Sequence, residues 1–299
     1  MTGQRGSRPK EYYGSIPIWR NISWSTRRRI AEYFFHSLTI GIVLLILGPI
    51  YWILATSLRP RAESVSLSPS LIPQEFTLAH YEGLLFATNF LTWLVNSLVV
   101  MIGVVVLTVS LATLGGYGLA RIDVPFRKTF ARGILFGYMF PAILLAIPMF
   151  IFWVEWGLID SYIGLILAET ALALPFSLWL MWKFFQTVPY SLEESAQMAG
   201  ASRFRAVVDV ALPMALPGMV AVAIFAFAIS WNEYTMPLIL MPSPENYVLT
   251  VGIETLIELD TVLWGRMMGA IFLAILPSFL FVFIFQKYML RGFRAGGVG

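Results

Sequence analysis

The sequence predicts an all-α integral membrane protein with six membrane-spanning helices and both chain ends in the cytoplasm. Three observations predict this class. The 299 residues are 58% hydrophobic and only 12% charged, the charges leave six long apolar stretches, and the basic residues gather between alternate stretches. Soluble domains carry about 25% charged residues on average, so half that fraction is typical of a chain that lies largely in lipid.

Six stretches are long enough to cross a bilayer, which takes roughly 20 apolar helical residues. Four of them contain no Asp, Glu, Lys or Arg, and the other two contain only Glu169 and only Glu233. Continuous apolar runs favour helices over the alternating strands of a barrel. We therefore predict one six-helix domain over residues 31–290, with spans at about 34–57, 91–116, 131–153, 161–185, 213–238 and 265–288.

The basic residues predict the orientation. Seventeen of the 20 Lys and Arg residues lie before the first span, at or beyond the end of the last, or in the connections between spans two and three and spans four and five and at the edges of those connections. Because positive charge is retained on the cytoplasmic side, these segments are expected there. They include a flexible basic arm over 1–30, expected to contact anionic lipid, and a tail over 291–299. The first apolar run is too long for the ~7–15-residue core of a cleaved signal peptide.

A charged, glycine-punctuated segment interrupts the apolar chain between spans four and five. Pro189 ends the preceding helix, and Ser191 and Glu194 have the spacing of a capping box at the start of a new one. Gly200 is suited to the left-handed position after that helix. One stripe reads Leu192, Ser195, Ala196 and Ala199, and the opposite side offers Glu193, Glu194 and Gln197. The segment predicts a short cytoplasmic helix in a rigid elbow, or in the simpler interpretation an ordinary amphipathic loop.

This segment resembles the EAA motif of ATP-binding-cassette (ABC) importer permeases, in which E-A-A is followed by glycine and then by I-x-L-P. The matching residues are Glu194-Ser195-Ala196, Gly200 and Val210-Ala211-Leu212-Pro213. Ser195 replaces the usual alanine, Ala199 stands where aspartate is common, and Val210 replaces isoleucine. Other segments resemble the carbohydrate branch, similar to the maltose-system permeases: SLRPRAE, TLAHYEGLL, VNSLVV, YGLAR, WNEYTMPL and QKYMLRGFRAGGVG.

The resemblance implies a coupling helix that docks on a cytoplasmic ATPase and switches the spans between inward- and outward-facing states. The residues it assigns to ATPase coupling are Glu193, Glu194, Ser195, Ala196, Ala199, Gly200, Leu212 and Pro213. It also implies a bacterial-type cytoplasmic membrane, a second homologous permease subunit, two ATPase subunits and an external solute-binding protein. The solute is expected to be a sugar or a related polyhydroxylated compound.

The sequence itself contains no G-x-x-x-x-G-K-[ST] motif. ATP and Mg²⁺ are therefore expected on the partner ATPase, with no cofactor on this chain. We expect no catalytic or metal-binding residues, because the only two histidines, His36 and His80, are predicted on opposite sides of the membrane. The arrangement of basic residues follows membrane topology, so we expect no nucleic-acid partner.

Polar side chains inside predicted spans are candidates for the substrate path, because such residues are costly in lipid and usually face a cavity. The candidates are Asn96, Glu169, Trp231, Asn232 and Glu233, all expected in the outer half of the membrane. Structural hydrogen bonding or an interface position is the alternative for each of them.

Two other functions and one other substrate class remain open. An ion-gradient-driven secondary transporter could use Glu169 and Glu233 as ion carriers, but no inverted repeat relates 1–150 to 151–299. A membrane-embedded enzyme would need a cluster of reactive side chains, and the sequence suggests none. An ABC importer of a non-sugar solute is a further alternative.

Overall fold

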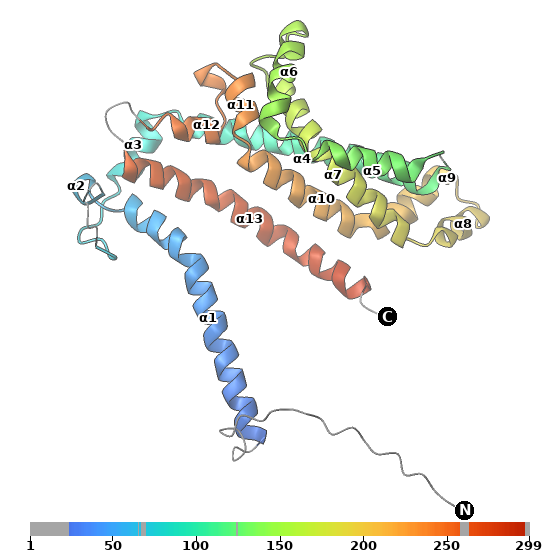
Figure 1. Ribbon diagram of the computed structural model, residues 1–299, viewed down its shortest axis with the longest axis horizontal. Helices are drawn as coiled ribbons and strands as arrows, with labels where there is room; N and C mark the ends of the chain where they lie inside the picture. The colour runs from blue at the N-terminus through green and yellow to red at the C-terminus, as the bar shows by residue number, and fades with distance from the viewer. Residues whose placement is uncertain (1–23, 65, 67–69, 124, 258–262, 297–299) are drawn as a thin grey trace, which may run out of the picture. The chain divides into compact units, whose positions relative to one another are not determined.

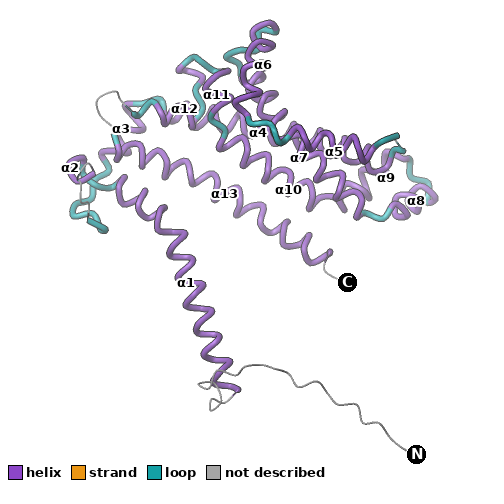
Figure 2. The backbone as a smooth tube through the Cα atoms, viewed as in Figure 1, coloured by secondary structure: helices purple, strands orange, loops and turns teal. Residues whose placement is uncertain are grey.

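The computed structural model describes residues 24–64, 66, 70–123, 125–257 and 263–296. These residues form helices joined by turns and loops, and no β-strand is found among them (Figure 2). The chain divides into two units, Met1–Trp52 and Ile53–Gly299. The all-helical class predicted from the sequence is therefore confirmed in the described part of the chain.

The first unit contains most of helix α1, Trp24–Ser57, which is 34 residues long. Large apolar side chains are exposed along its length, from Ile30 to Leu47. A helix that is apolar on all sides suits a lipid environment rather than a water-facing surface. Helix α1 already begins at Trp24, so residues 24–30 of the predicted flexible arm are helical. Residues 1–23 lie outside the described residues.

The core of the second unit is formed by α4 (Phe90–Arg121), α7 (Tyr162–Thr187) and α10 (Leu212–Asn232), which pack on one another (Figure 1). Small residues permit a close approach of α4 and α7. A Cβ atom on Gly116 would lie 2.8 Å from the backbone nitrogen of Trp182, and one on Gly103 would meet the side chain of Ile166 at 2.5 Å. Such positions let helices in membranes approach backbone to backbone. Helix α13 (Trp264–Gly296) packs against α10 and includes residues 291–296 of the predicted tail.

The third predicted span, 131–153, does not run as one straight helix. It is divided between α5 (Arg127–Gly137) and α6 (Ala142–Glu155), whose axes differ by 90°. Pro141 occupies the N-cap of α6, where its ring excludes a backbone N–H and disfavours helical geometry in the residue before it. Among the described residues five helices are long and apolar enough to cross a membrane, and the bent pair would make a sixth span.

The fifth predicted span, 213–238, differs at both ends. The helix begins earlier, with α9 (Arg203–Ala206) and a π-helical turn (Val207–Ala211) running directly into α10. It ends at Asn232, because Glu233 takes an extended backbone conformation and a separate helix, α11 (Thr235–Leu240), follows. Glu233 therefore lies beyond the helix in which it was predicted.

Short helices connect the long ones. They are α2 (Arg61–Ser64), α3 (Ala79–Ala87), α8 (Tyr190–Met198), a 3-10 turn (Pro244–Asn246) and α12 (Leu249–Glu254). Helix α3 packs against α13.

Candidate functional site

Helix α8 begins directly at a proline. Helix α7 ends at Thr187, Val188 is extended, and Pro189 is the N-cap residue of α8. The predicted capping box is wrong, because Pro189 offers no side-chain acceptor and Ser191 already lies within the first turn. The fixed φ of proline starts the helix two residues earlier than the capping-box spacing predicts. The carbonyl of Ser191 instead accepts a hydrogen bond from the Ser195 hydroxyl at 2.8 Å.

The other end of α8 has the predicted glycine turn. Gly200 has φ 95°, in the left-handed region that favours glycine. Its N–H donates to Gln197 O and the N–H of Ala201 donates to Ala196 O, both at 3.0 Å, which is the Schellman arrangement. Ser202 then caps α9 by accepting from the Arg205 N–H at 3.3 Å. Because both helix ends are capped, α8 and α9 are joined by a short, tight turn, which we call the elbow.

Glu193 lies on the inner side of α8, contrary to its predicted place beside Glu194 on an outward face. Its side chain is 1% exposed and pairs with Arg121 of α4 at 2.7 Å. The Tyr117 hydroxyl donates to its other carboxylate oxygen at 2.9 Å. The prediction was wrong because the spacing of residues within one helix does not reveal a buried basic partner on another helix.

The exposed surface of the elbow contains Glu194, Ser195 and Ala199, and Ala196 is half-buried. Two large apolar side chains that sequence reasoning missed are also exposed there, Met198 at 86% and Phe204 at 76%. The sequence did offer a signal for their exposure, because each is a large apolar residue within a segment that is otherwise polar or small. Of the remaining motif residues, Pro213 is exposed, whereas Leu212 packs on the core around Met181 and Phe185.

The candidates for the substrate path make separate sets of contacts. Glu169 of α7 is 1% exposed and accepts a hydrogen bond from Ser230 of α10 at 2.5 Å, which joins two core helices. Asn96 of α4 accepts from the Tyr162 hydroxyl at 2.8 Å. Its amide donates to the carbonyls of Glu245 and Tyr247, so it holds the 244–247 turn.

The three consecutive candidates after Ser230 point to different neighbours. The Trp231 indole donates to the Ala274 carbonyl of α13 at 3.2 Å, and its ring stacks on Phe227. Asn232 donates to Ala228 within its own helix. Glu233 accepts from the N–H groups of Thr235 and Met236, so its carboxylate caps α11. Each of the five candidate side chains is thus hydrogen-bonded to another group of this chain.

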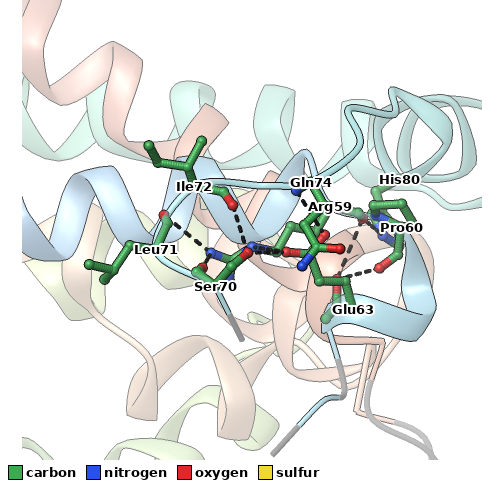
Figure 3. Close-up of polar contacts among 9 residues, drawn as sticks. Arg59, Pro60, Glu63, Ser70, Leu71, Ile72, Gln74 and His80 are labelled. Atoms are coloured by element: carbon green, nitrogen blue, oxygen red, sulfur yellow. Dashed lines mark hydrogen bonds and ion pairs between the residues drawn. The ribbon is translucent and has the colours of Figure 1, made fainter. Parts of the chain in front are cut away.

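The loop after α1 contains a cluster of polar contacts around the buried Arg59, which sequence reasoning did not single out (Figure 3). The guanidinium of Arg59 is 1% exposed, donates to the carbonyls of Ser70 and Leu71 and pairs with Glu63 at 3.4 Å. Glu63 in turn accepts from the Ser70 hydroxyl at 2.7 Å and the Gln74 N–H at 3.3 Å. These contacts connect residues 70–74 to Arg59 and Glu63. No trio of potential metal ligands was found among the described residues.

His80 connects this loop to α13. Its Nε2 lies 2.9 Å from the Arg59 carbonyl, and its ring fills the space beside Gly265, where a Cβ atom would come within 2.2 Å of it. Burial lowers the pKa of His80 below its ordinary value of 6.5, and the charges of Arg266 and Arg61 lower it further, against the raising effect of the Arg59 hydrogen bond. The imidazole is therefore held in its neutral form.

The described residues thus form long apolar helices of a membrane protein, and a short capped elbow between two of these helices exposes a charged and apolar tip. The chain belongs to the family described as "Binding-protein-dependent transport system inner membrane component", which matches residues 111–295. The predicted family and the inner-membrane location are thereby confirmed.

Similar proteins carry permease names. The chain is 32% identical to the inner membrane ABC transporter permease protein YcjP of Escherichia coli, over 86% of this chain and 92% of that protein. It is also 32% identical to the diacetylchitobiose uptake system permease protein NgcG of Streptomyces coelicolor, over 88% and 87% of the two chains. The trehalose transport system permease protein SugB of Mycobacterium tuberculosis is 32% identical, over 88% and 94%.

A solved structure shares the fold. The crystal structure of a bacterial ABC transporter involved in the import of the acidic polysaccharide alginate contains a chain with a TM-score of 0.75 and 23% identity. The match covers 89% of this chain and 98% of that chain. The helical arrangement of the described residues is therefore that of an ABC importer chain.

Proposed function

We propose that this chain is one of two membrane-spanning subunits of an ATP-driven importer, and that α8 receives the movement of a partner ATPase. One observation carries the proposal. The EAA-like residues form a short helix capped at a glycine turn, with Glu194, Ser195 and the apolar side chain of Met198 exposed at its surface. An exposed apolar group rimmed by charge is typical of a docking surface.

The remaining subunits follow from the family. We propose a second, homologous permease, two cytoplasmic ATPase subunits that hold ATP and Mg²⁺, and an external solute-binding protein. In this orientation α8 and both chain ends face the cytoplasm, and the loop around Arg59 faces outward, where the binding protein delivers the solute.

The proposed solute is a sugar or a related polyhydroxylated compound. Two relatives, a diacetylchitobiose uptake permease and a trehalose transport permease, support this class by their names. The candidates for the path remain Asn96, Glu169, Trp231, Asn232 and Glu233, although each already has a structural partner.

The test is reconstitution with the cognate subunits in proteoliposomes, with ATP hydrolysis and uptake as readouts. Glu194→Lys should release the ATPase during purification and abolish ATP-dependent uptake, because it reverses the charge of the exposed tip. Glu155→Lys makes the same change at an exposed position of α6 and should preserve both activities. Uptake that needs an ion gradient and no ATP would make the chain a secondary transporter.

The orientation has a separate test, because the chain contains no cysteine. Single cysteines at Ala201 and Ser64 should be labelled by a membrane-impermeant thiol reagent from opposite sides. Labelling of position 201 from outside intact cells would reverse the proposed topology.

A further inference from the structure

One buried cluster joins the end of α4 to α8. Arg121 Nε donates to Glu193 at 2.7 Å, and Tyr117 donates to the other carboxylate oxygen at 2.9 Å. Only 1% of the Glu193 side chain and 7% of the Arg121 side chain are exposed. Both oxygens of Glu193 are therefore occupied within the chain. Charge-assisted hydrogen bonds of this kind are stronger than neutral ones.

The same arginine also bridges the joint between α7 and α8. Its second terminal nitrogen donates to the Val188 carbonyl at 2.8 Å, and its guanidinium lies over the Tyr190 ring, 5.4 Å from the centroid. Val188 and Pro189 are the only residues between the two helices. Arg121 thus contacts residues on both sides of the point where α8 could bend.

The cluster connects α8 to a rigid base. Helices α4 and α7 pack closely along their lengths, and Gly116 lies against the α7 backbone one turn before Arg121. A buried charge pair has directional bonds and resists separation, because either charge left alone in a low-dielectric environment is costly. A displacement of α8 should therefore move the ends of α4 and α7 with it.

We propose that Arg121 and Glu193 form a latch that transmits movement of α8 to the α4–α7 pair, and that Glu193 is a positioning residue rather than a contact with the ATPase. The inference rests on the proposed function and refines the coupling role assigned to Glu193. Glu194, its exposed neighbour, remains the candidate for direct contact with the ATPase.

The experiment measures the distance between α4 and α8 by pulsed electron paramagnetic resonance. Spin labels are placed at Asp123 and Leu192, two exposed positions outside the proposed ATPase contact, in a chain without native cysteine. The complex with its cognate ATPase is compared without nucleotide and with ATP, Mg²⁺ and vanadate. The wild-type latch should give one narrow distance distribution that is the same in both states.

Glu193→Gln and Arg121→Gln should each broaden the distance distribution. Both variants should still retain the ATPase during purification. ATP hydrolysis stimulated by the binding protein, which reports the transmission of movement, should fall by about tenfold. Ser191→Ala, an exposed neighbour on α8, is the matched control and should keep the wild-type distribution. The double variant Arg121→Met with Glu193→Leu removes both charges and preserves volume, so it should fold and still show the broad distribution.

Two results would overturn the latch. One is a distribution in the double variant as narrow as in the wild type. The other is loss of the ATPase from Glu193→Gln but not from Arg121→Gln, which would make Glu193 an intermolecular contact. Failure of the proposed function is distinguishable, since no ATPase would then copurify even with the wild-type chain, whereas the distances still report on the latch.

Discussion

Gly116 of α4 lies against the backbone of Trp182 in α7, so closely that a Cβ atom on the glycine would be 2.8 Å from the Trp182 nitrogen and 2.9 Å from the Met181 carbonyl carbon. The backbone cannot yield as a flexible side chain can. This contact sets the distance between α4 and α7, the pair of helices to which the proposed latch connects α8.

Gly116→Ala should therefore destabilise the protein by about 1–3 kcal/mol, the usual effect of overpacking a close contact. The measurement is thermal unfolding in detergent. Gly118→Ala on the same helix is the control, because its Cβ would lie 3.9 Å from its nearest neighbour. Equal unfolding temperatures for the two variants would contradict the close approach.

Gly200→Ala should lower stability by about 1–2 kcal/mol, because an alanine at φ 95° is strained in the left-handed region. There is open space around the glycine, so the effect is conformational and not steric. Gly133→Ala in α5 also enters open space, but within a helix, and should be neutral or stabilising by up to ~1 kcal/mol. Chemical denaturation of both variants tests the difference in sign.

Asn96→Ala should release the 244–247 turn, because two backbone carbonyls and the Tyr162 hydroxyl lose their partner. We expect a cost of about 1–3 kcal/mol and faster proteolysis near Glu245. Asn232→Ala is the matched control, since Asn232 is exposed and bonds only to its own helix. If cleavage near Glu245 is unchanged in Asn96→Ala, the turn is held by other contacts.

The neutral state of His80 predicts a pH dependence of stability. Its pKa in the folded protein lies below the ordinary value of 6.5, so the unfolded chain binds the proton more readily. The contribution of His80 is then complete above about pH 6.5 and is lost as the pH falls below that value and through the lower pKa of the folded protein. His80→Gln should remove this part of the acid sensitivity. Unfolding temperatures of both proteins between pH 5 and 7.5 provide the test, and parallel curves would contradict it.

Local chemistry explains which parts of the elbow could be predicted. Gly200 and Pro189 act through their own backbone preferences, so the sequence alone indicated a turn and a helix boundary at these residues. The start of α8 was predicted incorrectly because a capping box and a proline both fit the same segment, and the proline prevailed. The third span was predicted as one helix because its apolar length is sufficient, although Pro141 divides it.

The sequence by itself determined the membrane class, the positions of most long apolar helices and the family. These features depend on the length of apolar stretches and on a short motif, and both are visible in the local sequence. Only the tertiary structure decided what the polar side chains contact. Glu193 and Glu194 are adjacent and chemically identical, yet one pairs with Arg121, 72 residues away, and the other is exposed. The partner of a buried charge depends on how helices pack in space, and a single sequence does not encode that in its local pattern.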